Sequence, residues 1–128
     1  MRGLNSFDYA VLRIVPRVDR EEFMNAGVIL YCKAQHFLAA KVHIDEARLL
    51  ALAPEIELDV VRLHLEAFTR ICKGDVDAGP IALLPQRERF HWLVAPRSTI
   101  IQISPVHSGL CEAPHLWLEK LFNQLVLI

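Results

Sequence analysis

The chain has 128 residues, a length typical of one domain, and 53% of them are hydrophobic against 23% charged. That composition provides enough apolar side chains for a core and excludes an intrinsically disordered chain. Lys and Arg number 14 and Asp and Glu number 15, and this near-neutral balance argues against a dedicated nucleic-acid binder.

The first third of the sequence predicts three strands. The run FDYAVLRIV at 7–15 is rich in aromatic and β-branched residues and apolar on both alternating faces. We therefore expect a central strand that is covered on two sides. The segment RVDREEFMN at 17–25 predicts one helical turn. GVILYC at 27–32 and HFLAAKVHI at 36–44 predict an antiparallel hairpin that turns at 33–35.

Two helices are expected next. Asp45 is a suitable N-cap for ARLLALA at 47–53, and Asp59 for VVRLHLEAFTRICK at 60–73. In the second helix one apolar face is formed by four side chains at helical spacing, namely Val61, Leu65, Phe68 and Cys72. Gly74 suits the position that follows the end of this helix.

The last third predicts a second hairpin and a last helix. The hairpin comprises FHWLVA at 90–95, a turn at PRS, and TIIQIS at 99–104. The segment SPVHSGLCEAP at 104–114 is expected to be irregular. Pro114 is placed to begin the helix HLWLEKLFNQLVLI at 115–128.

This order of elements predicts the fold class. Runs of strands and runs of helices joined by hairpins indicate an α+β fold. We expect a single domain over residues 1–128, a two-layer sandwich in which three helices pack on a mainly antiparallel sheet of about five strands.

The cellular location is expected to be the cytoplasm. The start, MRGLNSFDY, lacks the apolar run of a secretory signal, and no apolar run reaches the length of a membrane span. Cys32, Cys72 and Cys111 are an odd number of cysteines at wide spacings. Their pattern fits free thiols in a reducing compartment.

A candidate anion site combines residues of two segments. Arg13 lies within an otherwise apolar strand, where an unpaired charge is costly, and it needs a carboxylate or a ligand anion as partner. We group it with five others in one candidate site: Arg17, Arg20, Asn25, Arg97 and Ser98. The alternative is an internal ion pair, a solvated loop and an exposed turn.

A second, weaker candidate lies in SPVHSGLC. His107 and Cys111 would suit a nucleophilic thiolate with its base, and together with His115 they would suit a metal. The alternative is a buried cysteine with histidines in turns. Since the spacing matches no standard zinc signature and no nucleotide or hydrolase motif is present, we assign no metal and no cofactor.

Two long segments carry a family resemblance. They are DYAVLRIVPRVDREEFMNAGVILYC at 8–32 and ERFHWLVAPRSTIIQISPVHSGLC at 88–111. Together they resemble the bacterial family called domain of unknown function 3037. That resemblance implies a small stand-alone protein, often encoded beside a kinase-like protein similar to the HipA toxin. It carries over no catalytic residues, so whether the chain is an enzyme stays open.

Three functions follow as hypotheses. The first is a protein-interaction module, with the kinase-like protein as partner. The second is a small enzyme or binding protein for an anionic or phosphorylated small molecule, and the third is a weak nucleic-acid binder based on QRERFHWLVAPR. An enzyme should show a pocket where the basic side chains converge, whereas an interaction module should show an exposed apolar patch.

The last helix also predicts a homodimer. Its apolar side chains cover more of its circumference than one sheet face needs. They are Trp117, Leu118, Leu121, Phe122, Leu125 and Ile128. The alternative is a helix inserted into the core.

Overall fold

A five-stranded antiparallel sheet forms the middle of the molecule. The computed structural model describes residues 3–127. The strands are β1 (Asn5–Ile14), β2 (Met24–Cys32), β3 (Phe37–Val42), β4 (Ile101–Ile103) and β5 (His107–Cys111). β1 is central: β2 pairs along one of its edges and is followed by β3, while β4 and β5 share the other edge.

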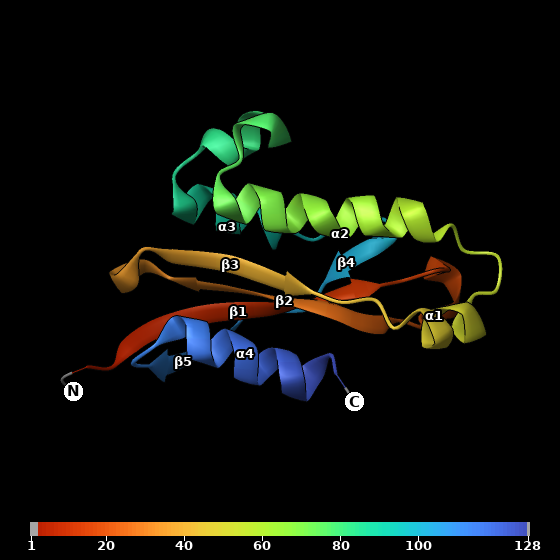
Figure 1. Ribbon diagram of the computed structural model, residues 1–128, viewed down its shortest axis with the longest axis horizontal. Helices are drawn as coiled ribbons and strands as arrows, with labels where there is room; N and C mark the ends of the chain where they lie inside the picture. The colour runs from red at the N-terminus through yellow and green to blue at the C-terminus, as the bar shows by residue number, and fades with distance from the viewer. Residues whose placement is uncertain (1–2, 128) are drawn as a thin grey trace.

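Helices lie on both faces of the sheet (Figure 1). On one face are α2 (Leu58–Lys73) and α3 (Gln86–Leu93), and on the other is α4 (Pro114–Leu125). The short α1 (Glu46–Leu52) follows β3 and lies at one end of the sheet. Four 3-10 turns complete the described structure: η1 (Val18–Arg20), η2 (Lys33–Gln35), η3 (Val76–Ala78) and η4 (Pro80–Leu83).

Two separate hydrophobic clusters explain this arrangement. Leu12 and Ile29 belong to the cluster under α2 and α3, whereas Phe7 and Leu30 belong to the cluster under α4. β1 and β2 therefore present apolar side chains to both faces, and each face needs a cover of its own. The expectation that the first strand is central and covered on two sides is confirmed.

Local signals place the helices largely where the sequence predicts them. The Asp45 side chain accepts a hydrogen bond from the Arg48 backbone N–H at 3.1 Å, as an N-cap does. Gly74 ends α2 with a φ of 72°, in the left-handed region where glycine is favoured. Asp59 is not the N-cap of α2. The helix begins at Leu58, with Glu57 at the N-cap position, and Asp59 lies in its first turn.

The α+β class and the mainly antiparallel five-stranded sheet are confirmed. The structure differs in having a fourth helix and in covering both faces of the sheet, so that three layers replace the expected two. FHWLVA is wrong as a strand, since residues 90–93 belong to α3. The segment expected to be irregular contains β5.

The last helix packs on the sheet. Leu118, Leu121 and Phe122 are buried in the cluster that it shares with β1 and β2, and Trp117 and Leu125 are half-buried beside it. Ile128 lies outside the described residues. Lys41 of β3 also reaches Glu119 of α4, with 2.5 Å between Nζ and Oε2. Most of the apolar stripe that suggested a dimer is thus covered within the chain.

Candidate functional site

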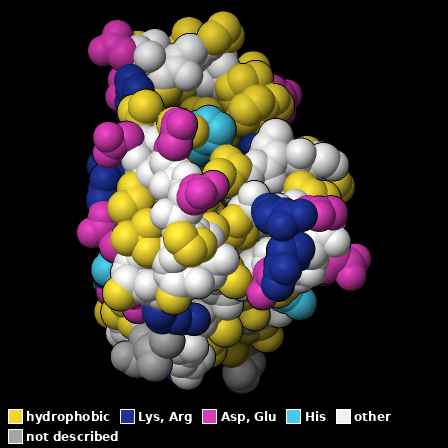
Figure 2. Space-filling model, turned by 90° about the vertical axis from the view of Figure 1, so that its right-hand side faces the viewer, with side chains coloured by type: hydrophobic (Ala, Val, Ile, Leu, Met, Phe, Trp, Pro, Cys, Tyr) yellow, Lys and Arg dark blue, Asp and Glu magenta, His cyan; other side chains and the backbone are white. Residues whose placement is uncertain are grey.

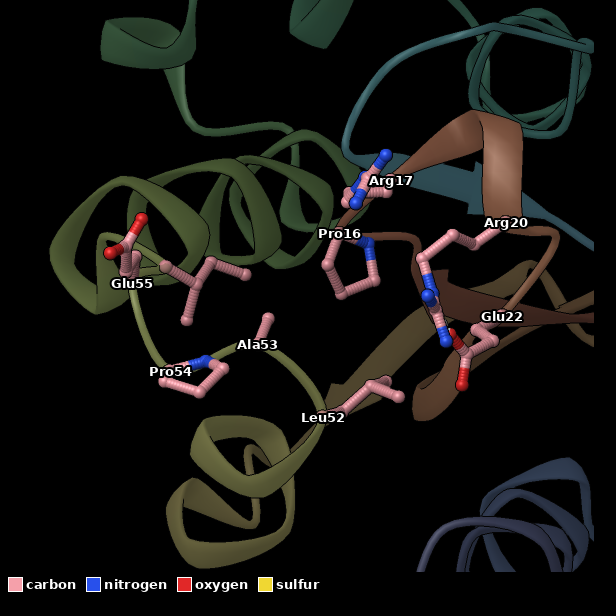
Figure 3. Close-up of a pocket in the computed structure, with 9 residues that line it drawn as sticks. Pro16, Arg17, Arg20, Glu22, Leu52, Ala53, Pro54 and Glu55 are labelled. Carbon is pink, nitrogen blue, oxygen red and sulfur yellow. Dashed lines mark hydrogen bonds and ion pairs between the residues drawn. The ribbon is translucent and has the colours of Figure 1, made fainter.

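A groove lies between η1 and the segment that follows α1 (Figure 3). Its volume is about 610 Å³. In Figure 3, Leu52, Pro54 and Glu55 lie on one side and Arg20 and Glu22 on the other. We call it the η1–α1 groove, and it is lined by Pro16, Arg17, Arg20, Glu22, Leu52, Ala53, Pro54, Glu55 and Ile56.

The two arginines of the η1–α1 groove already have carboxylate partners. Arg17 donates to both carboxylate oxygens of Asp19, from Nε at 3.2 Å and from Nη2 at 2.6 Å, and Arg20 pairs with Glu22. The hydrogen bond from Arg17 lowers the pKa of the Asp19 carboxyl below its ordinary value, and Glu22 raises the pKa of Arg20. An anion entering the groove would have to compete with these internal carboxylates.

The face that carries α1 shows the same mixture of charges (Figure 2). Lys and Arg side chains lie directly beside Asp and Glu side chains, and hydrophobic side chains spread between them. The face therefore lacks the single sign of charge that a site built to collect anions or phosphates would carry.

Arg13 and Asn25 form a neighbouring pair on the sheet. They are opposite each other in the register of β1 and β2, next to an irregularity in the pairing. The Arg13 guanidinium lies over the Phe23 ring, 4.3 Å from its centroid, and Asn25 Nδ2 donates to the Leu125 carbonyl at 3.0 Å. Within the described chain, Arg13 Nε and Asn25 Oδ1 are buried and have no hydrogen-bond partner.

Arg97 lies in a second groove, on the α2 and α3 side of the sheet. Its guanidinium carbon is 5.3 Å from the Phe68 ring centroid and 5.1 Å from that of Trp92, and Nη2 donates to the Trp92 carbonyl at 2.7 Å. The groove has a volume of about 210 Å³. We call it the α2–α3 groove; the residues lining it include Leu63, Phe68, Ile71, Trp92, Arg97 and Ile101.

The histidine and cysteine candidates are kept apart by the strand that carries them. His107 and Cys111 are the two ends of β5, and four residues of extended chain span about 13 Å. His107 is exposed and lies against Tyr9, with ring centroids 5.3 Å apart, whereas Cys111 is buried. Burial and the nearby Cys32 raise the pKa of the Cys111 thiol, which disfavours a nucleophilic thiolate.

The predicted anion set is thus divided among three places. Arg17 and Arg20 share the η1–α1 groove, Arg97 lines the α2–α3 groove beside an exposed Ser98, and Arg13 pairs across the sheet with Asn25. Sequence reasoning missed the aromatic walls around Arg97, because Trp92 was assigned to a strand and not to a helix facing α2. Over residues 3–127 no cluster of three or more His, Cys, Asp or Glu side chains could hold a metal ion.

The described helices are also too short or too polar to cross a membrane. Searches of curated proteins and of solved structures find no match. A family model described as protein of unknown function (DUF3037) matches residues 9–126, which is nearly the whole length and includes the second half of β1, both grooves and α4. The chain is therefore a member of the DUF3037 family.

Proposed function

We propose that the chain is a protein-interaction module. The observation that carries this proposal is the division of the basic side chains, which do not converge on one pocket as those of an enzyme for an anionic substrate would. Arg17 and Arg20 are moreover neutralised by carboxylates of their own segment.

The α2–α3 groove is the surface that we assign to the partner. Leu63 and Trp92 both line this groove and are 66% and 45% exposed, so that two large apolar side chains lie exposed in the wall of the same groove. Leucine and tryptophan at the rim of an apolar groove provide area that a partner can cover. Trp in particular is enriched among the side chains that dominate binding energy at interfaces.

The partner that we propose is the kinase-like protein similar to the HipA toxin, within the bacterial cytoplasm. The support is the gene neighbourhood that the family resemblance implies, together with three buried and unbridged cysteines, which fit a reducing compartment. The interaction would join two separately encoded chains.

Co-purification of variants from the native host tests the proposal. Leu63→Glu and Trp92→Glu place charges in the groove, whereas Val76→Glu and Leu83→Glu place them at exposed apolar positions outside it, which are 70% and 64% exposed. We expect a stoichiometric partner with the wild type and with the two control variants. Recovery with the groove variants should fall at least about tenfold.

Titration of the purified kinase-like protein into the same variants separates direct from indirect binding. The proposal is overturned if no partner is recovered in stoichiometric amount, or if the groove variants retain it as well as the controls do. Circular dichroism of each variant confirms that the chain is folded before binding is compared.

A second candidate function is binding of a phosphorylated small molecule in the η1–α1 groove. The observation in its favour is that two arginines line one groove of about 610 Å³. Calorimetry with pyrophosphate should then detect binding that is lost in Arg17→Gln with Arg20→Gln. Arg70→Gln is the matched control, since Arg70 is exposed, pairs with Asp75 and lies outside the groove. Equal heats for all variants would dismiss this candidate.

Self-association through α4 stays a prediction. Since Leu118, Leu121 and Phe122 are buried against the sheet, a dimer on this side would have to use the exposed Leu116 and Leu127. Sedimentation velocity of the wild type and of Leu116→Glu at micromolar concentration tests it. A monomer mass for both proteins would contradict it.

A further inference from the structure

We infer that the α2–α3 groove binds a peptide segment that presents one apolar side chain and a carboxylate, and that Arg97 is the residue that pairs with this carboxylate. This inference rests on the proposed function and states the chemistry of the partner. It is carried by the surroundings of Arg97. Arg17 and Arg20 have carboxylate partners and Arg13 packs on Phe23 of its own sheet, whereas Arg97 lines a groove.

Arg97 is a half-buried cation without a carboxylate. No ion pair is formed by Arg97 within residues 3–127, whereas Arg17 and Arg20 each have one. Its one hydrogen bond uses Nη2, so that Nε and Nη1 have no acceptor among the described residues. Partial burial lowers the pKa of Arg97 from its ordinary value.

The aromatic rings fix where this charge lies. Phe68 and Trp92 each have their ring centroid within about 6 Å of the guanidinium carbon, which is the range of cation–π attraction. Their contacts leave the guanidinium at the wall of an apolar groove with two nitrogens unpaired. A carboxylate accepting from those nitrogens would form a charge-assisted pair in a partly dry environment, where such pairs are strongest.

The size of the groove sets the size of the group that enters it. Its volume of about 210 Å³ is below the ~300 Å³ at which pockets for whole drug-sized ligands begin. It is large enough for one aliphatic side chain beside a carboxylate. That is the size of an anchoring residue on a peptide, with the rest of the segment lying over the exposed Leu63 and Trp92.

N-acetyl-leucine and N-acetyl-leucinamide test the inference directly. The two probes share an isobutyl side chain and nearly the same shape, and only the first carries a carboxylate. Nuclear magnetic resonance titration of the full chain should show shifts of the Trp92 indole and Arg97 guanidinium signals. We expect the acid to bind about tenfold more tightly than the amide, the gain typical of one charge-assisted pair.

Variants of Arg97 and a matched arginine complete the test. Arg97→Gln should abolish the preference for the acid, and Arg97→Lys should keep part of it because the charge is retained. Arg87→Gln, at an exposed position of α3 outside the groove, should leave the preference intact. The inference is overturned if acid and amide bind equally to the wild type, or if the preference survives in Arg97→Gln.

Failure of this test is distinguishable from failure of the proposed function. If the partner still co-purifies and is lost in Leu63→Glu while the acid shows no advantage, the module stands and the assignment of Arg97 falls. If the acid is preferred but no partner co-purifies, the groove binds carboxylates and the proposed function falls.

Discussion

Burial controls the chemistry of the cysteines. Cys32, Cys72 and Cys111 are all free and buried. Loss of contact with water raises the pKa of the Cys72 thiol from 9.0 to about 12. A thiol that is held neutral and away from solvent is a poor nucleophile, because the thiolate is the reactive form.

Thiol titration therefore has an expected outcome. Ellman's reagent at pH 8 should react slowly with all three cysteines in the native protein and rapidly with all three in denaturant. Because the pKa of Cys72 is raised on folding, its contribution to stability is full below pH 9 and is lost as the pH rises toward 12. The free energy of unfolding, measured with urea at several pH values across that range, should decline as the pH rises. The decline should be smaller in Cys72→Ala. A rapidly modified thiol in the native protein would contradict the assignment.

Arg13 carries the clearest polar imbalance among the described residues. Its Nε atom is buried without an acceptor, while the guanidinium rests on Phe23. The sequence predicted that this charge would need a partner, and over residues 3–127 it has no carboxylate within ion-pair distance. Sequence alone could not show that an aromatic face would take that place, because Phe23 reaches Arg13 only once β1 and β2 have paired.

Replacing Arg13 by methionine tests this description. Methionine keeps the length of the side chain and removes the unpaired donor, so we expect a free energy of unfolding that is unchanged or higher by about 1 kcal/mol. Arg13→Ala, which also removes the packing on Phe23, should lower it. A loss of more than about 2 kcal/mol in Arg13→Met, measured by urea unfolding, would show that the charge itself is stabilising.

At the scale of elements, one hydroxyl, that of Ser104, contributes to the edge of β1 along which β4 and β5 pair. Pro105 interrupts this pairing because it has no backbone N–H to donate. Ser104 just before it is buried, and its Oγ accepts a hydrogen bond from the Val11 N–H at 2.8 Å. Its own N–H donates to the Val11 carbonyl at 2.9 Å, so that Ser104 continues the pairing of β1 up to the break.

Ser104→Ala should therefore destabilise the fold. The Val11 N–H would be left buried without an acceptor, at a cost of about 1–3 kcal/mol. Ser108→Ala is a matched control on the same edge, because Ser108 is exposed and its Oγ donates to Asp8 at 2.6 Å. The control should lose less than about 1 kcal/mol. Equal losses in the two variants would refute this role of Ser104.

The helices and strands also show which parts of the fold the sequence could predict. Periodicity and caps predicted α2, the β2–β3 turn and the start of α4, because those signals are local. Its aromatic residues led to the assignment of FHWLVA to a strand. The helix that forms there is stabilised by hydrogen bonds to other segments of the chain. Arg89 of α3 donates to the Ile71, Cys72 and Leu84 carbonyls at 2.8–2.9 Å, and that contact cannot be seen in local sequence.

The sequence could predict individual residues of the candidate site, but it could not predict how they are arranged. The sequence identified the arginines as residues in need of partners, and it could not tell which partners they would find. Asp19 and Glu22, two positions from their arginines, were available locally, whereas Phe68 is far in sequence from Arg97. Convergence on one site failed because it depended on the wrongly predicted second hairpin.

At the scale of the whole molecule, stability should be highest in β1. This strand is covered on both faces and paired along both edges, whereas β3 is at the edge of the sheet. We expect the amides of Ala10 and Leu12 to exchange with solvent only through global unfolding and those of β3 to exchange by smaller openings. Native-state hydrogen exchange measured by nuclear magnetic resonance checks this order. Faster exchange in β1 than in β3 would contradict it.

The central position of β1 also has a consequence for how the chain is made. β1 leaves the ribosome before β4 and β5, and its second edge is completed by residues such as Ser104, which is 93 positions later than its partner Val11. Until then one edge of an apolar strand has no neighbour, and such edges are where nascent chains associate wrongly. Closing a loop of this length is also slow compared with the local β2–β3 pairing. Chaperone demand should therefore last from the emergence of β1 until β4 and β5 dock.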